Sequence, residues 1–146
     1  MKKYLFLSMA ILALTFTNCK KDEDTDETSA GSTYLKMKID NANEQTFDAD
    51  VTVAGGQINI SGTNGANTLN IVFSSDASGN LDDNQYGITY SEGQESIFNS
   101  VIAYDSELNI TKNDTSGKIV AGEFSVEYYD DAQNLHTAEG SFDLEY

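Results

Sequence analysis

The sequence predicts an all-β protein: an antiparallel sandwich or flattened barrel of eight to nine strands, preceded by a signal peptide and a disordered tether. Apolar and polar residues alternate along most of the chain after residue 33, which is the period of a strand with one buried face. Gly, Asn and Asp separate these runs, and there is no proline. No stretch after Phe16 has helical periodicity. We therefore divide the chain into a signal peptide (1–18), a lipidated cysteine with its tether (19–33) and a β domain (34–146).

The alternating runs define the expected strands in chain order. Most of them place one apolar face against one polar face, but residues 97–104 are more uniformly apolar. We expect that segment to be a strand buried on both faces, or one that switches faces. The nine expected strands cover residues 35–40, 47–53, 57–61, 69–73, 88–90, 97–104, 108–111, 120–128 and 138–146.

Short turns connect these strands. Asn64-Gly65 lies between two alternating runs and predicts a hairpin with a type I′ turn. Gly55-Gly56 and Glu92-Gly93 mark further reversals. Because the connections are short, we expect neighbouring strands to pair as a meander.

The first 18 residues have the pattern of a secretion signal. Lys2 and Lys3 precede an apolar run, 4–16, of about 13 residues. A membrane-spanning helix needs about 20 apolar residues, so this run is too short to remain as a span. The only cysteine of the chain, Cys19, follows at the position where the mature protein would begin.

The segment from Thr15 to Cys19 resembles the lipobox of bacterial lipoproteins, with Phe16 and Asn18 at positions where that family prefers other residues. The resemblance implies that the Cys19 thiol is joined to diacylglycerol and that cleavage leaves Cys19 as the first residue. Two or three acyl chains, such as palmitate, would then hold the protein, because each buried CH₂ contributes about 0.8 kcal/mol. The alternative is that Cys19 is an incidental residue or a free thiol.

Lysines and acidic residues follow this cysteine directly. Lys20, Lys21, Asp22, Glu23 and Asp24 resemble the export signal of Bacteroidota surface lipoproteins. The resemblance implies transport to the outer face of the outer membrane. The alternative is a solvated tether that keeps the domain away from the lipid.

Composition excludes several partners. The chain has 24 acidic residues and no arginine, and all of the acids lie after Cys19, so the mature chain carries a net charge near −18. Binding to phosphate backbones requires clustered Lys and Arg, which argues against nucleic acid. The same charge argues against docking on anionic lipid, so the acyl chains are the expected membrane contact. We expect no cofactor, and we expect a monomer that its charge keeps soluble.

Several segments together resemble a domain-of-unknown-function family of small Bacteroidota lipoproteins. The resemblance implies a fold and a location, and it supplies no catalytic or ligand residues. The segments that carry it are 35–40 with Phe47, 58–62, 108–112 with 122–125, and 139–143.

His136 is the only histidine, and it shares the inward parity of Ala138 and Phe142. A metal or acid–base role would need partners, and the chain has no second histidine and no further cysteine. We therefore expect a histidine at the rim of the last strand, either hydrogen-bonded or open to water.

Two acidic segments contain the oxygen ligands that calcium prefers. One departs from the EF-hand pattern at Leu81 and Gly87, so we interpret it as an acidic turn, with a weak calcium site as the alternative. The second segment contains Asp130, Asp131 and Asn134. The first segment, which departs from the EF-hand pattern, contains Asp76, Ser78, Asn80, Asp82, Asp83 and Asn84.

The tyrosines have two interpretations. They can stack on sugars, but carbohydrate platforms favour Trp, which is absent, so we expect ordinary packing. Those considered are Tyr86, Tyr90, Tyr104, Tyr128 and Tyr129.

We expect no enzyme, because the sequence has no nucleophile motif, P-loop or dinucleotide motif. The prediction is a surface-facing outer-membrane lipoprotein that acts as an interaction or envelope component, with an envelope protein or a glycan as its partner. The alternative is a lipocalin-like binder of a small apolar ligand or glycan. Bulky inward residues would fill a small barrel and favour the first prediction. These residues are Phe47, Ile60, Ile71, Phe73, Ile110, Phe124, Phe142 and Leu144.

Overall fold

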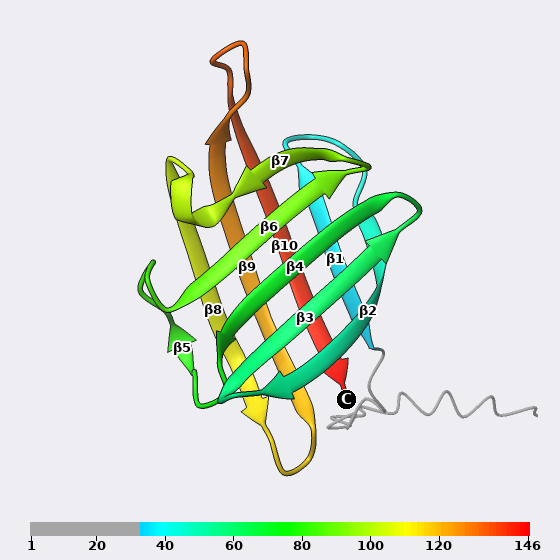
Figure 1. Cartoon of the computed structure of the whole chain (residues 1–146), viewed down its shortest axis with the longest axis vertical. Coiled ribbons are helices and arrows are strands. Elements are labelled where there is room, and N and C mark those ends of the chain that lie inside the picture. Colours follow the sequence, from blue (N-terminus) through cyan, green and yellow to red (C-terminus); the bar gives the residue numbers. More distant parts are fainter. Residues whose placement is uncertain (1–32) are drawn as a thin grey trace, which may run out of the picture.

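The computed structural model describes residues 33–146, which form a strongly curled antiparallel sheet of ten strands, a half-barrel (Figure 1). One short 3₁₀ helix, η1, joins β7 to β8. No helix in this part of the chain has the length and apolar character needed to cross a membrane. In chain order the elements are β1 (Tyr34–Ile39), β2 (Gln45–Ala54), β3 (Gln57–Asn64), β4 (Asn67–Ser74), β5 (Gly79–Asn80), β6 (Tyr86–Glu92), β7 (Glu95–Asn99), η1 (Ser100–Ile102), β8 (Asp105–Asp114), β9 (Ile119–Tyr129) and β10 (Leu135–Glu145).

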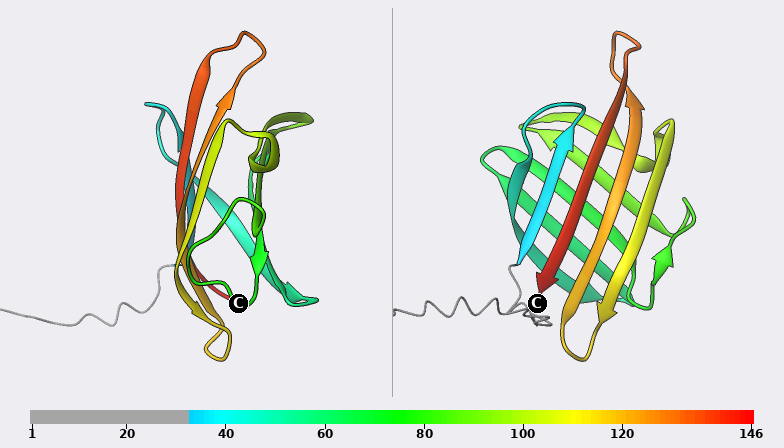
Figure 2. Two further views of the ribbon diagram at one scale, coloured as in Figure 1. Left: turned by 90° about the vertical axis from the view of Figure 1, so that its left-hand side faces the viewer. Right: turned by 180° about the vertical axis from the view of Figure 1, so that it is seen from behind.

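The sheet is a meander that curls until its first and last strands meet. Its order is β5-β8-β9-β10-β1-β2-β3-β4-β6-β7, so β10 pairs with β1. Leu35 lies opposite Phe142 on one side and opposite Phe47 on the other. Strand β2 pairs with β1 near its start and with β3 along the rest of its length. It therefore passes from one layer to the other, and the two layers face each other in Figure 2.

The predicted fold class is confirmed, with ten strands in place of eight or nine because the two-residue β5 pairs with β8. The prediction for residues 97–104 is wrong. The strand ends at Asn99, whose side-chain oxygen accepts a hydrogen bond from the Val101 N–H at 3.1 Å and caps η1. The Ser100 hydroxyl accepts a hydrogen bond from the buried Ile88 N–H at 2.9 Å. These two side-chain bonds turn the chain before the apolar run can continue as a strand.

The turns follow the glycines, with one shift. Gly55 and Gly56 have φ values of 61° and 79°, as a type I′ turn requires. Asn64 pairs with Asn67, so the second hairpin turns at Gly65 and the alanine after it, and not at Asn64-Gly65. Only Gly65 has positive φ there, 62°, which fits type II′ and corrects the predicted type I′.

Side chains fill the space between the two layers. All eight residues predicted to face inward are buried, and aromatic rings cross the interior from both layers. The ring of Phe73 stacks on that of Phe142, with centroids 6.4 Å apart. A second series runs from Phe47 through Tyr90 and Phe98 to Tyr128, with successive centroids 6.2, 5.7 and 5.3 Å apart. The interior is therefore a packed core.

The half-barrel has two ends, and the chain enters at one of them. At the near end, Tyr34 begins β1 opposite Asp143, and the Tyr146 N–H donates to the Lys118 carbonyl. At the far end lie the β1–β2 loop, the β9–β10 hairpin and η1 (Figures 1 and 2). The 11 residues of β10 span about 35 Å between these ends.

Candidate functional site

The residues predicted to carry the lipid and the export signal lie outside the described part of the chain. These are Cys19, Lys20, Lys21, Asp22, Glu23 and Asp24. The structure places the residue that follows the predicted tether, Tyr34, at the near end. Within residues 33–146, the His136 network and most of the exposed large apolar residues lie at the far end.

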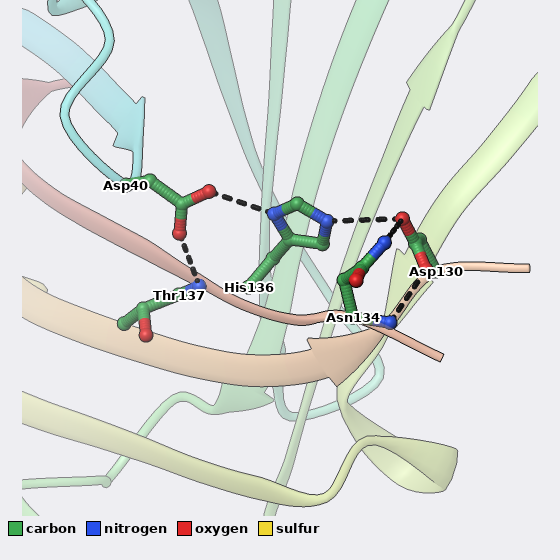
Figure 3. A network of polar contacts seen from close by, with 5 residues as sticks. All are labelled: Asp40, Asp130, Asn134, His136 and Thr137. Atoms are coloured by element: carbon green, nitrogen blue, oxygen red, sulfur yellow. Dashed lines mark hydrogen bonds and ion pairs between the residues drawn. The ribbon is translucent and has the colours of Figure 1, made fainter. Parts of the chain in front are cut away.

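His136 lies at the far end between two carboxylates (Figure 3). Its Nδ1 is 2.7 Å from Asp40 Oδ2, and its Nε2 is 3.3 Å from Asp130 Oδ2. Asp40 Oδ1 also accepts the Thr137 N–H at 2.9 Å. The imidazole ring stacks on Tyr128, with centroids 5.5 Å apart. His136 is thus a hydrogen-bonded rim histidine, as predicted.

Local backbone geometry positions both carboxylates. Asp40 follows the last residue of β1 and has φ of 52°, a left-handed conformation that aspartate tolerates better than most residues. Asp130 closes the β9–β10 hairpin by accepting two hydrogen bonds from Asn134, from the backbone N–H at 2.8 Å and from the side chain at 3.0 Å. The two turns therefore present their carboxylates to the histidine from opposite sides.

This arrangement changes the pKa of all three groups. Hydrogen bonds to Asp40 and then to Asp130 raise the pKa of His136 above its ordinary value. The pKa of Asp130 falls to about 2, chiefly through its hydrogen bonds to Asn134. The pKa of Asp40 is lowered, first by the hydrogen bond to His136 and then by that to Thr137. The network therefore favours an imidazolium between two carboxylates.

The hydrogen bonds of this network hold two parts of the fold together. Both nitrogens of His136 are engaged, so the ring has no free position for a proton acceptor or a metal. It joins the end of β1 to the β9–β10 hairpin across 96 residues of sequence.

The acidic segments do not converge on one point. Asp76 hydrogen-bonds the Ser74 hydroxyl, and the backbone N–H of Asp82 donates to the Gln85 side chain. The two residues of β5 divide the first segment. Within residues 33–146, no three His, Cys, Asp or Glu side chains are grouped closely enough to hold a metal ion.

Of the five tyrosines considered, three are buried in the core and two are exposed on the surface. Tyr86, Tyr90 and Tyr128 are buried, and desolvation followed by the hydrogen bond to Glu92 raises the pKa of Tyr90 to about 12. Tyr104 and Tyr129 are exposed and pack edge to face, with centroids 5.6 Å apart. Packing therefore accounts for the first three and leaves the other two on the surface.

Sequence reasoning missed an exposed apolar cluster at the far end, which we call the far-end patch. The parity of the last strands could have indicated its strand residues, because Tyr129 follows the inward Tyr128 and must point outward. The exposure of η1 had no such signal. The far-end patch consists of Val101, Ile102, Tyr104, Tyr129 and Leu135.

Comparisons with known proteins add a family and no activity. Searches of curated proteins and of solved structures each found no match. The model of the domain of unknown function DUF6252 matches residues 31–143, which include all strands but the end of β10. The chain therefore belongs to the DUF6252 family, a family of unknown function.

Proposed function

We propose that the protein is a non-enzymatic lipoprotein of the outer membrane, displayed on the cell surface, whose β domain acts as an interaction or envelope component. The observation that carries the proposal is Cys19, which lies three residues after a short apolar run and is followed by two lysines and an acidic segment. That order is typical of a Bacteroidota-type lipoprotein with a surface export signal. Acyl chains on Cys19 would provide the membrane contact.

The placement of the two ends supports this proposal. The chain enters the domain at the near end, through Tyr34. An anchor at Cys19 would therefore attach the domain to the membrane at its near end, about 35 Å from the far end. The far-end patch then becomes the surface most accessible to a partner.

The packed core favours this function over a lipocalin-like binder. A binder of that kind needs a cavity inside the barrel. The inward side chains of both layers, among them Phe73 and Phe142, fill that space instead. An interaction at the outer surface is the better-supported function.

Substitution of the cysteine tests the anchor. The variant Cys19→Ala loses the thioether-linked chains, so it should move from the membrane pellet to the soluble fraction, because those chains are the proposed membrane contact. Mass spectrometry of the native protein should find Cys19 as the first residue, diacylated or triacylated. The variant Ser32→Ala, within the predicted tether, is the matched control and should stay in the pellet.

Protease added to intact cells tests the display. The native protein should lose its β domain to the protease while a periplasmic marker stays intact. A Cys19→Ala variant that pellets after a high-salt wash, or a native protein that begins at another, unmodified residue, would overturn the proposal.

A further inference from the structure

The far end concentrates the exposed apolar surface of the described residues. Six large apolar side chains are exposed in residues 33–146, and five of them form the far-end patch, while Val53 alone lies apart. Ile102 is 84% exposed and Val101 is 72% exposed. Tyr129 contacts Tyr104 and lies opposite Leu135 on the neighbouring strand, so the patch extends from the residue before β8 to the end of β9 and the start of β10. Exposed apolar side chains gathered at one end of a domain mark a contact surface.

A depression of about 320 Å³ adjoins the patch, between η1 and the start of β8. The residues that line it include the apolar Val101 and Tyr104 and the acidic Asp83 and Asp105. An elongated side chain with a hydrocarbon stem and a positive head matches that combination.

The walls of the depression are held by hydrogen bonds. The Ser106 N–H donates to Asp105 Oδ1 at 2.9 Å, and the Ser106 hydroxyl bonds the Tyr86 hydroxyl at 2.8 Å. Ser100, from the other side, accepts the Ile88 N–H. Both serines are buried. The depression is therefore preformed, and a ligand need not order it.

The charge around the patch selects its occupant. Asp131 lies two residues after the patch residue Tyr129, and Asp105 follows Tyr104, while Asp130 is already paired with His136. The four lysines of residues 33–146 lie elsewhere. On β1, Lys36 pairs with Glu44 and Lys38 pairs with Glu139. The other two are Lys112, in β8, and Lys118, in the β8–β9 turn toward the near end.

This distribution disfavours a second copy, because two patches face to face would bring carboxylates of the same sign together. It favours a partner with positive charge around an apolar centre, and it would steer such a partner toward the far end.

We infer that the far-end patch and the adjoining depression bind a cationic amphipathic polypeptide segment. A Lys or Arg of the partner lies in the depression, with its stem against Val101 and Tyr104 and its head between Asp83 and Asp105. The Tyr104 ring adds a cation–π contact. Apolar side chains of the partner cover Tyr129 and Leu135. The inference deepens the proposed function, since it names the surface and the partner class of the displayed domain.

Peptide binding tests the inference. The full acylated chain is placed in zwitterionic phosphatidylcholine nanodiscs, with empty nanodiscs as the blank, and titrated with a labelled amphipathic peptide of Lys, Leu and Ser. We expect binding that weakens with added salt. A peptide with Glu for each Lys should not bind, and one with Ser for each Leu should bind more weakly.

Paired variants of the protein provide the matched controls. Ile102→Ser with Tyr104→Ser should raise the Kd about tenfold or more, because exposed aromatic anchors dominate such contacts. Asp83→Asn with Asp105→Asn should raise the Kd and flatten the salt dependence, and the amide oxygen introduced at position 105 can still accept the Ser106 N–H. Val53→Ser should bind as the native protein does. Asp48→Asn with Asp50→Asn, exposed carboxylates of β2, removes the same charge elsewhere and should bind nearly as well.

Several outcomes overturn the inference. Patch variants that bind the peptide as tightly as the native protein would overturn it. So would β2 variants that lose as much binding as the patch variants. The cationic peptide could fail to bind while a neutral oligosaccharide binds, or while the protein self-associates in sedimentation. If the patch variants abolish that binding or self-association, the surface belongs to another occupant. Thermal unfolding of each variant excludes loss of the fold. Membrane fractionation of the same variants separates the anchor proposal from the peptide-binding inference. A protein that is found in the soluble fraction but still binds the peptide contradicts only the anchor.

Discussion

At the scale of single residues, three strand glycines decide how the aromatic rings pack. Gly122 lies opposite Phe142 on β10, and Gly140 lies opposite Phe124 on β9. A Cβ atom at Gly122 would lie 2.6 Å from the Asn109 carbonyl oxygen and 2.7 Å from Phe142 Cζ. Gly62 is crowded in the same way by Leu35 and Phe47. Each ring occupies the space that a neighbouring side chain would need, so these glycines serve packing and not turning.

The variant Gly122→Ala should therefore destabilise the protein by about 1–3 kcal/mol, because the added methyl group overpacks the core. Gly87 provides the control, since it lies in β6 with no atom within 4 Å of a Cβ built there. Gly87→Ala should be neutral or stabilising by up to about 1 kcal/mol, through the lower entropy of the unfolded chain. Urea unfolding measures both. Equal losses at the two positions would contradict the packing role of Gly122.

At the scale of elements, one histidine fastens the β9–β10 hairpin to the end of β1. Asp40 and His136 are distant in sequence, and their hydrogen bond spans the junction at which the last strand meets the first. The same carboxylate accepts the Thr137 N–H, so side-chain bonds continue the pairing of the two strands beyond its last residue pair. These bonds stabilise the fold most while the imidazole is protonated and the carboxylates are ionised, because both ring nitrogens then donate to a charged acceptor.

Stability should therefore depend on pH in two directions. The folded pKa of His136 lies above 6.5, so its contribution is complete below 6.5 and is lost as the pH rises through the folded value. The folded pKa of Asp130 is about 2, below its ordinary 3.8, so its contribution is complete above 3.8 and is lost as the pH falls toward 2. The melting temperature should be highest between these ranges.

Substitution of the histidine isolates its part of the effect. His136→Gln should lower the melting temperature more at mildly acidic pH than at alkaline pH, because only the former protonates the native ring. Thermal unfolding at both pH values, monitored by circular dichroism, gives the comparison. A loss that is the same at both pH values would mean that the charge of His136 contributes nothing.

At the scale of the whole molecule, the half-barrel lacks a strand ladder between β7 and β8 and is closed there by other bonds. The Leu81 N–H donates to the Leu108 carbonyl at 2.9 Å. The Asn113 side chain donates to the carbonyls of Ser75 and Ala77, at 3.0 Å each. The Tyr86 and Ser106 hydroxyls meet between β6 and β8. The interior is therefore sealed by one backbone bond and several side-chain bonds along the side where β7 and β8 form no ladder.

A double-mutant cycle measures this closure. Ser106→Ala should cost about 1–3 kcal/mol, because it leaves the Tyr86 hydroxyl without its partner. Tyr86→Phe with Ser106→Ala should cost less than the two single losses together, with a coupling of about 0.5–1.5 kcal/mol. Tyr146→Phe is the control, since the Tyr146 hydroxyl is buried without a hydrogen-bond partner. Additive losses in the cycle would show that the bond does not stabilise the closure.

The extent of prediction differs between strand and site. Alternation is a local property, so the strands were placed to within a few residues, and even the inward parity of His136 was correct. The partners of His136 were not predictable, because Asp40 and Asp130 are two acids among many, and only folding brings them together. The segment after Phe98 failed for a related reason. Its apolar composition fits a buried strand, but the Ser100 hydroxyl bonds the Ile88 N–H, a neighbour that only the folded sheet supplies.

The sequence by itself determined that this protein is built of antiparallel strands around a filled interior, because a period of two residues fixes which side chains each strand can bury. It also provided the lone cysteine on which the proposed anchor rests. Only the tertiary structure decided that β10 closes on β1, that β7 and β8 share no ladder, and that five apolar side chains gather opposite the point of entry. Those features join residues far apart along the chain, and local patterning carries no information about which distant strands will meet.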